Sequence, residues 1–366
     1  MKQTIQDVVK FFQQVPSRYT YSFDRIQAKF EVTREEIQEA KKLFMGSLFE
    51  TLPVSQSEMQ VERMWVNSNG KTSVQMKPLT ETFSYDPIEY KAWDIEIKPS
   101  SKICMVYTSD KHIGASVGSE AMLNNHYDKE EFESRMQKLA VELIDLDNLH
   151  KFDQMIVCDL GDAIDGMDGF TGSRMHKLPQ NMGNREVFQT FIDVHLKFFH
   201  TLKSHLHCPN LEFRTAGESN HGGDMEWMCF KTLGMMLHEK YNMNVYIGNK
   251  FIEHFTKGDH TFLLCHGKDF KDMKFGLPRY ADAKTINYFK SYMEHHGITS
   301  KFIHVVKGDL HMNNSEYTQF FRYKNVMSMF GSSKWVMTNF MSNTKGVSID
   351  ILNLGTNSIT EHYLFF

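Results

Sequence analysis

The sequence predicts an α/β protein preceded by a small helical domain. Two observations support this prediction. From residue 102 onward, short apolar runs of strand length alternate with stretches of helical periodicity. Before residue 79, apolar residues recur at helical spacing and are followed by a hairpin signal. We therefore expect an N-terminal domain over 1–78, a connector over 79–101 and a main domain over 102–366.

The composition indicates a globular protein with a large core. The chain has 366 residues, 41% of them hydrophobic, which is enough to bury a sizeable interior. Its net charge of −4 means that any contact with nucleic acid would need a local basic patch. No apolar stretch approaches the roughly 18 residues of a membrane span, and no secretory signal is present. We expect a cytoplasmic protein without a membrane partner.

The cysteines support the same localisation. None of the five forms a CxxC pair, and three lie in apolar runs. They are Cys104, Cys158, Cys208, Cys229 and Cys265. This usage predicts reduced core residues and no disulfide framework.

The N-terminal domain resembles a winged helix-turn-helix. Apolar spacing predicts helices at 5–12, 22–30 and 33–44, and Thr33 with Glu36 forms a capping box for the third. Asn69-Gly70 between two strand-like runs predicts a hairpin, with Lys71 at the wing. Contact with DNA or RNA and use as a dimerisation module both stay open, because three basic residues of the third helix are offset by three glutamates. These are Arg34, Lys41 and Lys42, and Glu35, Glu36 and Glu39.

In the main domain, five apolar runs predict strands at 103–107, 155–157, 211–213, 261–265 and 302–306. Helical periodicity predicts helices at 132–149 and 187–202. A closing pair of strands is expected over 346–366, around Gly355-Thr-Asn357. This alternation favours α/β layering, with a site assembled at strand ends.

Each of the five runs leads into a short polar motif. In chain order the motifs are Asp110-Lys-His112, Gly161-Asp162-Ala-Ile-Asp165, Asn220-His221, His266-Gly267 and Gly308-Asp309-Leu-His311. Carboxylate, imidazole and amide groups from five loops are what a two-metal hydrolytic site requires, because divalent cations take oxygen and nitrogen ligands. A lone His is more often a core residue, but five motifs in order favour a metal site.

One further Asp-x-His pair has a different context. Asp193 and His195 have the spacing of Asp110 and His112, but they lie within the amphipathic stretch 187–202. We expect a structural role for them. Asp110 and His112 instead follow the apolar run 103–107, so their side chains should emerge from a strand-to-loop turn.

The ordered motifs resemble those of the calcineurin-like metallophosphoesterase superfamily, over residues 102–366. The resemblance implies a metallophosphoesterase-type β-sandwich flanked by helices. It also implies that Asp110, His112 and His311 bind one metal, that Asp162 bridges, and that Asn220, His266 and Asp309 bind the second. His221 would be the catalytic acid, oriented by Asp165, while a hydroxide bridging the metals attacks phosphorus.

Two positions depart from the family pattern. Asp309 stands where the family has His, which favours a harder cation; Mn²⁺ is the expected metal, with Mg²⁺, Fe and Zn²⁺ as alternatives. Ser219 stands where the family has Gly before Asn, so the geometry of that loop is less defined.

The substrate is indicated by weaker features. Asp110-Lys-His112-Ile-Gly114 is most similar to the repair-exonuclease branch, and Gly166 replaces the Arg of protein phosphatases. Lysines and aromatic residues alternate over 268–290, which fits either a single-strand track or a solvated helix face. The favoured function is a nuclease or phosphodiesterase acting on DNA or a nucleotide phosphodiester. A phosphomonoesterase or cyclic-nucleotide phosphodiesterase with an oligomerising N-terminal domain, as in a homodimer, and an inactive DNA-binding regulator are the alternatives.

Overall fold

The computed structural model describes residues 59–66, 72–78, 101–118, 125–172, 176–217, 219–269, 276–342 and 344–366. The chain divides into two compact units, Met1–Asp86 and Pro87–Phe366. Each unit is considered by itself.

The first unit contains the predicted hairpin. Strands β1 (Met59–Val66) and β2 (Thr72–Pro78) pair antiparallel, with a register shift between Val61 and Arg63. The predicted Asn69-Gly70 turn and the three predicted helices lie outside the described residues. The winged helix-turn-helix therefore stays a prediction.

The second unit is built on two β-sheets. The six-stranded sheet has the order β13-β12-β3-β4-β5-β6, and the five-stranded sheet has the order β10-β11-β9-β8-β7. The first sheet comprises β3 (Lys102–Thr108), β4 (Gln154–Asp159), β5 (Asn210–Thr215), β6 (Asn244–Tyr246), β12 (Gly346–Asn353) and β13 (Ser358–Phe365). The second comprises β7 (Glu253–Lys257), β8 (His260–Cys265), β9 (Phe302–Lys307), β10 (Asn314–Tyr317) and β11 (Arg322–Asn325).

Parallel pairing sets the direction of the strands that precede the motifs. Strands β3 to β6 run parallel to one another, as do β8, β9 and β11. The carboxyl ends of parallel neighbours lie at one edge of a sheet, so the loops that follow them lie together. β12 pairs antiparallel with both β3 and β13, and so joins the end of the chain to the first strand of this unit.

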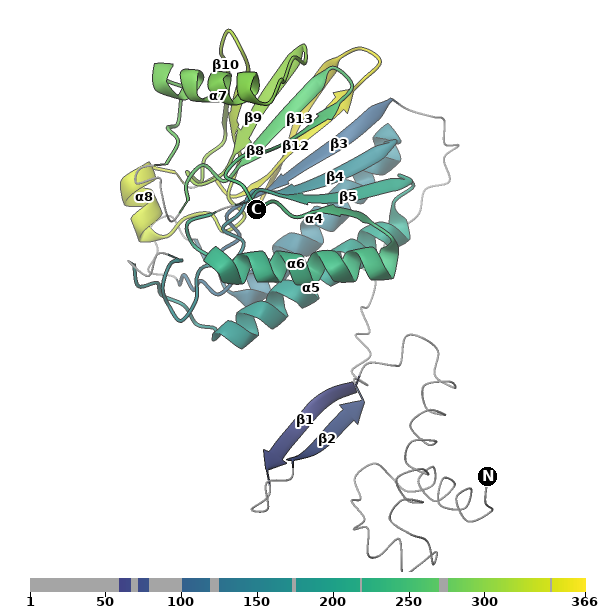
Figure 1. The fold of residues 1–366 in the computed structure, drawn as a ribbon, viewed down its shortest axis with the longest axis vertical. Coiled ribbons are helices and arrows are strands. Elements are labelled where there is room, and N and C mark those ends of the chain that lie inside the picture. The colour runs from purple at the N-terminus through teal and green to yellow at the C-terminus, as the bar shows by residue number, and fades with distance from the viewer. Residues whose placement is uncertain are drawn as a thin grey trace, which may run out of the picture. The chain divides into compact units, whose positions relative to one another are not determined.

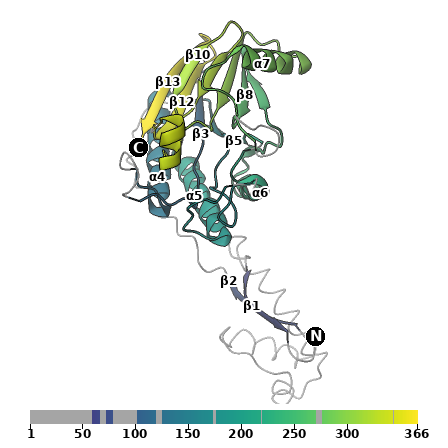
Figure 2. The ribbon, with the colours of Figure 1, turned by 90° about the vertical axis from the view of Figure 1, so that its left-hand side faces the viewer.

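Helices cover the outer faces of the two sheets, as Figures 1 and 2 show. Along the six-stranded sheet lie α4 (Lys129–His150), α5 (Asn184–His205) and α6 (Gly223–Tyr241). α7 (Ala283–His295) packs on the five-stranded sheet, and the short α8 (Lys334–Phe340) lies near the motif loops. This α/β sandwich flanked by helices agrees with the predicted fold class.

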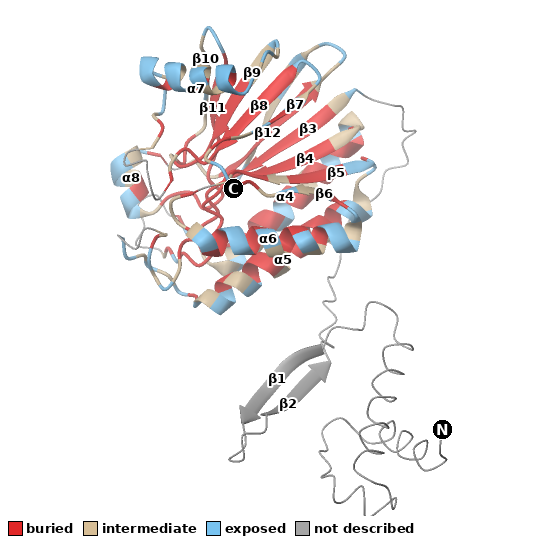
Figure 3. Ribbon diagram, viewed as in Figure 1, coloured by how far each residue is buried: buried red, intermediate tan, exposed pale blue. Residues whose placement is uncertain are grey.

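Two apolar clusters account for this layering. Between the sheets, Met105 of β3 and Ile156 of β4 pack with Phe262 and Leu264 of β8. On the outer face of the five-stranded sheet, Leu263 packs in the cluster that includes residues of α7. Successive residues of β8 thus face opposite layers, as strand geometry requires. Figure 3 shows the buried residues concentrated on the strands.

A charged cluster also connects the sheets. Arg322 of β11 donates from Nη1 to Asp350 of β12 at 2.8 Å, and Lys324 donates to the same carboxylate at 2.5 Å. All three side chains are at most 1% exposed. Glu361 of β13 pairs with Arg322 as well. The bidentate geometry and the two cations offset the cost of burying Asp350.

The strands predicted from the five apolar runs, the two helices at 132–149 and 187–202, and the closing strand pair are all observed. The prediction of unpaired, buried cysteines is also confirmed. The described part of the 268–290 segment includes the start of α7, which buries Phe289. The choice between a single-strand track and a solvated helix face stays a prediction. None of the helices in the described ranges has the length and apolarity that a bilayer crossing needs.

Candidate metal centre

The motif loops are joined to one another through their backbones. Asp110 N donates to the Gly161 carbonyl at 3.0 Å, and His112 N donates to the Asp162 carbonyl at 2.9 Å. On the other sheet, Gly308 N donates to the His266 carbonyl at 3.0 Å. The loops after β3 and β4 therefore form one unit, and those after β8 and β9 form another.

Close approach across the sheets requires a glycine at position 308. A Cβ there would lie 2.0 Å from Ser109 Oγ and 2.9 Å from Asp110 Oδ2. Only a residue without a side chain lets the loop after β9 lie against the loop after β3. Steric crowding between the two loops thus explains why a glycine precedes Asp309 in the sequence motif.

Five motif residues have a left-handed backbone. Apart from glycine, ten described residues have positive φ, and half of them are candidate site residues. These are Asp110, His112, Asp162, Asp309 and His311, with φ between 46° and 71°. Such conformations cost on the order of 1–3 kcal/mol each and collect at functional sites. The loops are therefore shaped to direct these side chains.

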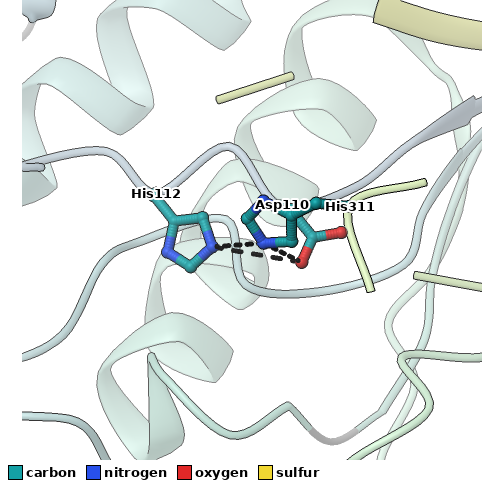
Figure 4. A group of neighbouring side chains, drawn as sticks. All are labelled: Asp110, His112 and His311. Atoms are coloured by element: carbon teal, nitrogen blue, oxygen red, sulfur yellow. Dashed lines mark hydrogen bonds and ion pairs between the residues drawn. The ribbon is translucent and has the colours of Figure 1, made fainter. Parts of the chain in front are cut away.

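The first cluster of candidate ligands contains Asp110, His112 and His311 (Figure 4). His311 Nε2 lies 3.2 Å from Asp110 Oδ1, and His112 Nε2 lies 3.9 Å from the same oxygen. The two Nε2 atoms are 3.4 Å apart. All three side chains are at most 5% exposed.

The second cluster contains Asp110, Asp162 and His266. His266 Nε2 lies 3.1 Å from Asp162 Oδ2 and 3.1 Å from the amide oxygen of Asn220. Asn220 therefore joins this cluster. Asp110 is common to both clusters, whereas the family resemblance implies that Asp162 is the shared ligand.

The donor set fits divalent cations. In each of the three histidines Nδ1 faces an oxygen acceptor: Asp165 Oδ1 at 3.0 Å for His112, the Leu160 carbonyl at 3.0 Å for His266, and the Gly331 carbonyl at 2.5 Å for His311. These acceptors assign one proton to Nδ1 and leave each Nε2 directed inward, where it can bind a cation once any proton it holds is released, as in histidines that bind metals. Two facing lone pairs repel unless a cation or proton lies between them.

The carboxylates support the same interpretation. Among the described carboxylates, Asp110 Oδ1 and Asp165 Oδ2 are buried without a hydrogen bond of acceptable geometry, although Asp110 Oδ1 lies 3.2 Å from His311 Nε2. A buried carboxylate oxygen without a partner is costly, and a cation would supply one. Burial opposes ionisation of Asp162, but His266 outweighs it and lowers the Asp162 pKa well below its usual range. The carboxylate is therefore ionised and ready to bind a cation.

His221 differs from the three ligand candidates in its exposure. Its side chain is 19% exposed, against 0% for His266 and 5% for His311. Its backbone N–H donates to Asp162 Oδ1 at 2.9 Å, and its Nε2 lies 4.0 Å from Asp162 Oδ2. Burial lowers the pKa of His221, but Asp162 and Asp165 outweigh it and raise the value to about 9. The imidazole thus carries a proton at the edge of the site.

Asp165 orients two histidines in different ways. Its carboxylate faces His112 Nδ1 at 3.0 Å, whereas it lies 3.6 Å from His221 Nδ1. The hydrogen bond of His221 Nδ1 goes to the backbone carbonyl of Asp165 at 2.8 Å. The side chain of Asp165 therefore acts mainly on a candidate metal ligand, and its backbone acts on the candidate acid.

Asp309 is placed less directly. It lines the same cavity as the other candidates, but among the described residues it belongs to none of the three-residue ligand clusters. Its Oδ2 is 3.0 Å from where a Cβ on Gly276 would stand. The roles assigned from sequence to Asp309 and to the other eight candidates stay predictions.

The sequence analysis missed Glu226 of α6, which binds two site loops. Its Oε2 accepts from Ala163 N at 2.6 Å and Ile164 N at 3.3 Å, inside the second motif. Its Oε1 accepts from Ser219 Oγ at 2.7 Å, next to Asn220. Burial, followed by repulsion from Asp162, raises the pKa of Glu226 to about 7.

A second missed contact is the buried ion pair of Lys111 with Asp159. It joins the first motif to the end of β4. Asp159 Oδ1 also accepts from Gly161 N at 3.0 Å, so this carboxylate fixes the start of the second motif.

The clusters open into a cavity of about 490 Å³. His112, Asp162, Asn220, His221 and His311 line one part of it. The lining also includes Val117, Leu178, Phe330, Trp335 and Phe340, and the basic residues Lys177, Lys268 and Lys334. The volume is that of a small-molecule site.

Comparison with known proteins gives no family model and no curated protein that matches this chain. Solved structures are similar at low identity. An archaeal phosphodiesterase is 12% identical, covers 71% of this chain and 99% of its own, and has a TM-score of 0.33. Vps29 from Entamoeba histolytica in complex with Zn²⁺ is 10% identical, covers 72% and 98%, and scores 0.30.

A predicted phosphoesterase from Streptococcus pneumoniae is 10% identical, covers 72% of this chain and 98% of its own, and has a TM-score of 0.26. TM-scores at this level carry no argument about function. The assignment below therefore rests on the geometry of the site.

Proposed function

We propose that this protein is a dinuclear-metal-dependent phosphoesterase of the calcineurin-like superfamily that cleaves phosphodiester bonds in DNA or in a nucleotide. The observation that carries the proposal is the convergence of three buried Nε2 atoms, from His112, His266 and His311, on the carboxylates of Asp110 and Asp162. A cation would account both for this convergence and for the separation of 3.4 Å between the Nε2 atoms of His112 and His311.

Residues of the two clusters would hold the metals: Asp110, His112 and His311 one ion, and Asp110, Asp162, Asn220 and His266 the other. Mn²⁺ is the proposed metal. When bound, two such ions would supply charge for the phosphoryl oxygens and lower the pKa of a water molecule.

His221 would protonate the leaving oxygen. Its Nδ1 donates to the Asp165 carbonyl, so the second proton of the imidazolium lies on Nε2, beside Asp162. Its exposure lets Nε2 reach a substrate in the cavity, whereas the ligand histidines are shielded. General acid catalysis of this kind contributes about 10²–10⁴-fold to the rate.

The function is tested by turnover of bis-p-nitrophenyl phosphate, p-nitrophenyl phosphate and labelled single- and double-stranded DNA, with Mn²⁺ and with EDTA. Asp162→Ala should lose metal and activity together. Asp193→Ala is the matched control, because Asp193 lies on α5 in the other Asp-x-His pair, outside the cavity lining.

Diester or DNA cleavage that disappears in EDTA and in Asp162→Ala would support the proposal. Turnover of the monoester alone would contradict the phosphodiesterase function and indicate a phosphatase. Bound metal without turnover of any substrate would contradict an enzymatic role.

A further inference from the structure

The cavity beside the metal centre has an aromatic wall, formed by Phe330, Trp335 and Phe340. Phe330 contacts the ring of His112 at 5.1 Å. Phe340 lies 6.5 Å from the ring of His311, and Trp335 contacts Phe340 edge to face at 5.3 Å. The wall thus leads from two candidate ligands outward to Trp335.

Trp335 is 59% exposed although it lines the cavity. An exposed Trp forgoes a large gain from burial. Its neighbour Val336 on α8 is buried, so the helix has an inward face that Trp335 does not use. An aromatic ring left open at the wall of a cavity is a surface on which a planar ligand can stack.

The wall is attached to a candidate metal ligand at both ends. Before α8, the Gly331 carbonyl accepts from His311 Nδ1 at 2.5 Å. After α8, the Ser342 hydroxyl donates to the His311 carbonyl. Asn125 donates to the Ser332 carbonyl at 2.7 Å and fixes the same segment from a third side. The position of Trp335 is therefore set relative to the metal centre.

Charge beside the wall favours a nucleotide over a purely apolar ligand. Lys177, Lys268 and Lys334 line the same cavity as these rings. A cavity lined by both lysines and aromatic rings can recognise a phosphate and its base, since every base offers a π-face.

We propose that the wall formed by Phe330, Trp335 and Phe340 binds the base of one nucleotide by stacking, and so selects nucleoside phosphate esters as the substrate class. This inference rests on the proposed phosphoesterase function for its role in catalysis. Binding of the base itself does not depend on turnover.

The first test is binding of AMP and of ribose 5-phosphate in Mg²⁺, followed by fluorescence of the full-length protein. The two probes differ only in the base. The wild type should bind AMP more tightly, with quenching of Trp335 fluorescence. Trp335→Ala should weaken AMP binding by about 5- to 150-fold, the range of base–aromatic stacking, and leave ribose 5-phosphate within about twofold.

Two variants control this measurement. Trp335→Phe should keep most of the preference for AMP, because it keeps a ring, but lose the fluorescence change. Trp227→Ala removes an exposed Trp of α6 that is absent from the cavity lining, and it should change neither affinity. Equal weakening of both probes in Trp335→Ala, or no change in either, would overturn the inference.

A kinetic comparison separates this inference from the function on which it rests. Thymidine 5′-p-nitrophenyl phosphate and methyl p-nitrophenyl phosphate share a leaving group and differ in the nucleoside. Trp335→Ala should lower kcat/KM for the first ester by the fold-change seen in binding and spare the second. If Trp335→Ala cleaves both esters with no selective loss, base stacking on the wall is contradicted and the phosphoesterase function is supported. Selective AMP binding without cleavage of either ester would support base stacking on the wall and contradict the phosphoesterase function.

The same variant distinguishes a free nucleotide from a strand end. A single-stranded oligonucleotide with a 5′-phosphate should displace AMP from the wild type if the wall binds a terminal base. If the oligonucleotide displaces AMP from the wild type and binds more weakly to Trp335→Ala, the wall binds the end of a strand. AMP binding that the oligonucleotide does not disturb supports a free nucleotide, and both results agree with stacking on the wall.

Discussion

Glu226 and Ser219 form a hydrogen bond of 2.7 Å that joins helix α6 to the loop carrying Asn220. The other oxygen of Glu226 holds the backbone of the second motif. One carboxylate therefore sets the relative positions of the loops that carry Asp162 and Asn220. Groups that orient metal ligands in this way typically affect metal affinity by about 10- to 100-fold.

We expect Glu226→Ala to weaken binding of the second metal by about 10- to 100-fold, with the first metal less affected. Titration calorimetry with Mn²⁺ measures this. Glu226→Gln keeps one acceptor oxygen and should fall between Ala and the wild type. Unchanged affinity in the Ala variant, with its fold confirmed by circular dichroism, would show that the hydrogen bonds do not position the ligands.

His221→Ala should retain both metals and lose turnover. Because His221 is proposed to act on the leaving oxygen, kcat should fall by about 10²–10⁴-fold on a diester with a poor leaving group. The loss should be smaller for p-nitrophenyl esters, whose leaving group needs little protonation. Equal losses on both esters would argue for a binding role.

Metal binding should release protons and strengthen as pH rises. Burial lowers the pKa of His266, but Asp162 and its neighbours outweigh it and raise the value to about 10 in the metal-free protein. Below that pKa His266 holds a proton that the metal must displace, so affinity should rise about tenfold per pH unit for each proton released. Calorimetry in buffers of different ionisation enthalpy counts these protons. A flat affinity between pH 6.5 and 8.5 would be inconsistent with the raised pKa.

Gly308→Ala should disrupt the centre although it adds a single methyl group. The new Cβ would stand 2.0 Å from Ser109 Oγ and 2.9 Å from Asp110 Oδ2, so these side chains or the loops that carry them must move. We expect loss of metal binding at both clusters, since Asp110 belongs to each. Gly183→Ala is the matched control, because a Cβ at that position meets nothing within 4 Å. Normal metal content in Gly308→Ala would show that the loops have room to separate.

Asp350→Asn should destabilise the fold without acting on the site. Removing one partner of a buried ion pair costs about 3–5 kcal/mol, and Arg322 and Lys324 would keep only the part-exposed Glu361. Burial raises the pKa of Asp350, but Lys324 and Arg322 outweigh it and lower the value. The stabilisation is therefore present above the ordinary Asp pKa of about 4 and is lost as pH falls below it.

Thermal unfolding at pH 7 and pH 3 checks this prediction. The difference between wild type and Asp350→Asn should be larger at pH 7 than at pH 3. Glu361→Gln should have a weaker effect, because the Glu361 side chain is 27% exposed. Equal differences at both pH values would contradict the proposed linkage.

The strands before the motifs could be predicted because each is a short apolar run that ends on polar residues. Helix α6 could not, because Gly223 and Gly234 disfavour a helix by propensity, and packing overrides that preference. Strands β10 and β11 are four residues long and carry no alternating pattern. Their pairing depends on β9 and on contacts across the sandwich, which local sequence does not encode.

The sequence predicted which residues form the candidate site but not the contacts between them. The motifs identify Asp110, Asp162 and His266 because each follows a strand. The sharing of Asp110 between clusters and the contact of Asp165 with His112 depend on how two sheets meet. Glu226 gives no sequence signal, because its role arises only when α6 brings it back to the loop after β4.

Asp162 and four other motif residues have a left-handed backbone. The strain of that conformation lowers the stability of the fold at the residues that are proposed to act in the site. Glycine adopts that conformation without strain, so Asp162→Gly would relieve stored energy in the same step that removes the ligand. Where this relief exceeds the loss of the contacts that Asp162 makes with His266 and His221, selection for thermostability alone would erode the centre. A screen for stabilised variants of this chain needs an activity filter from its first round.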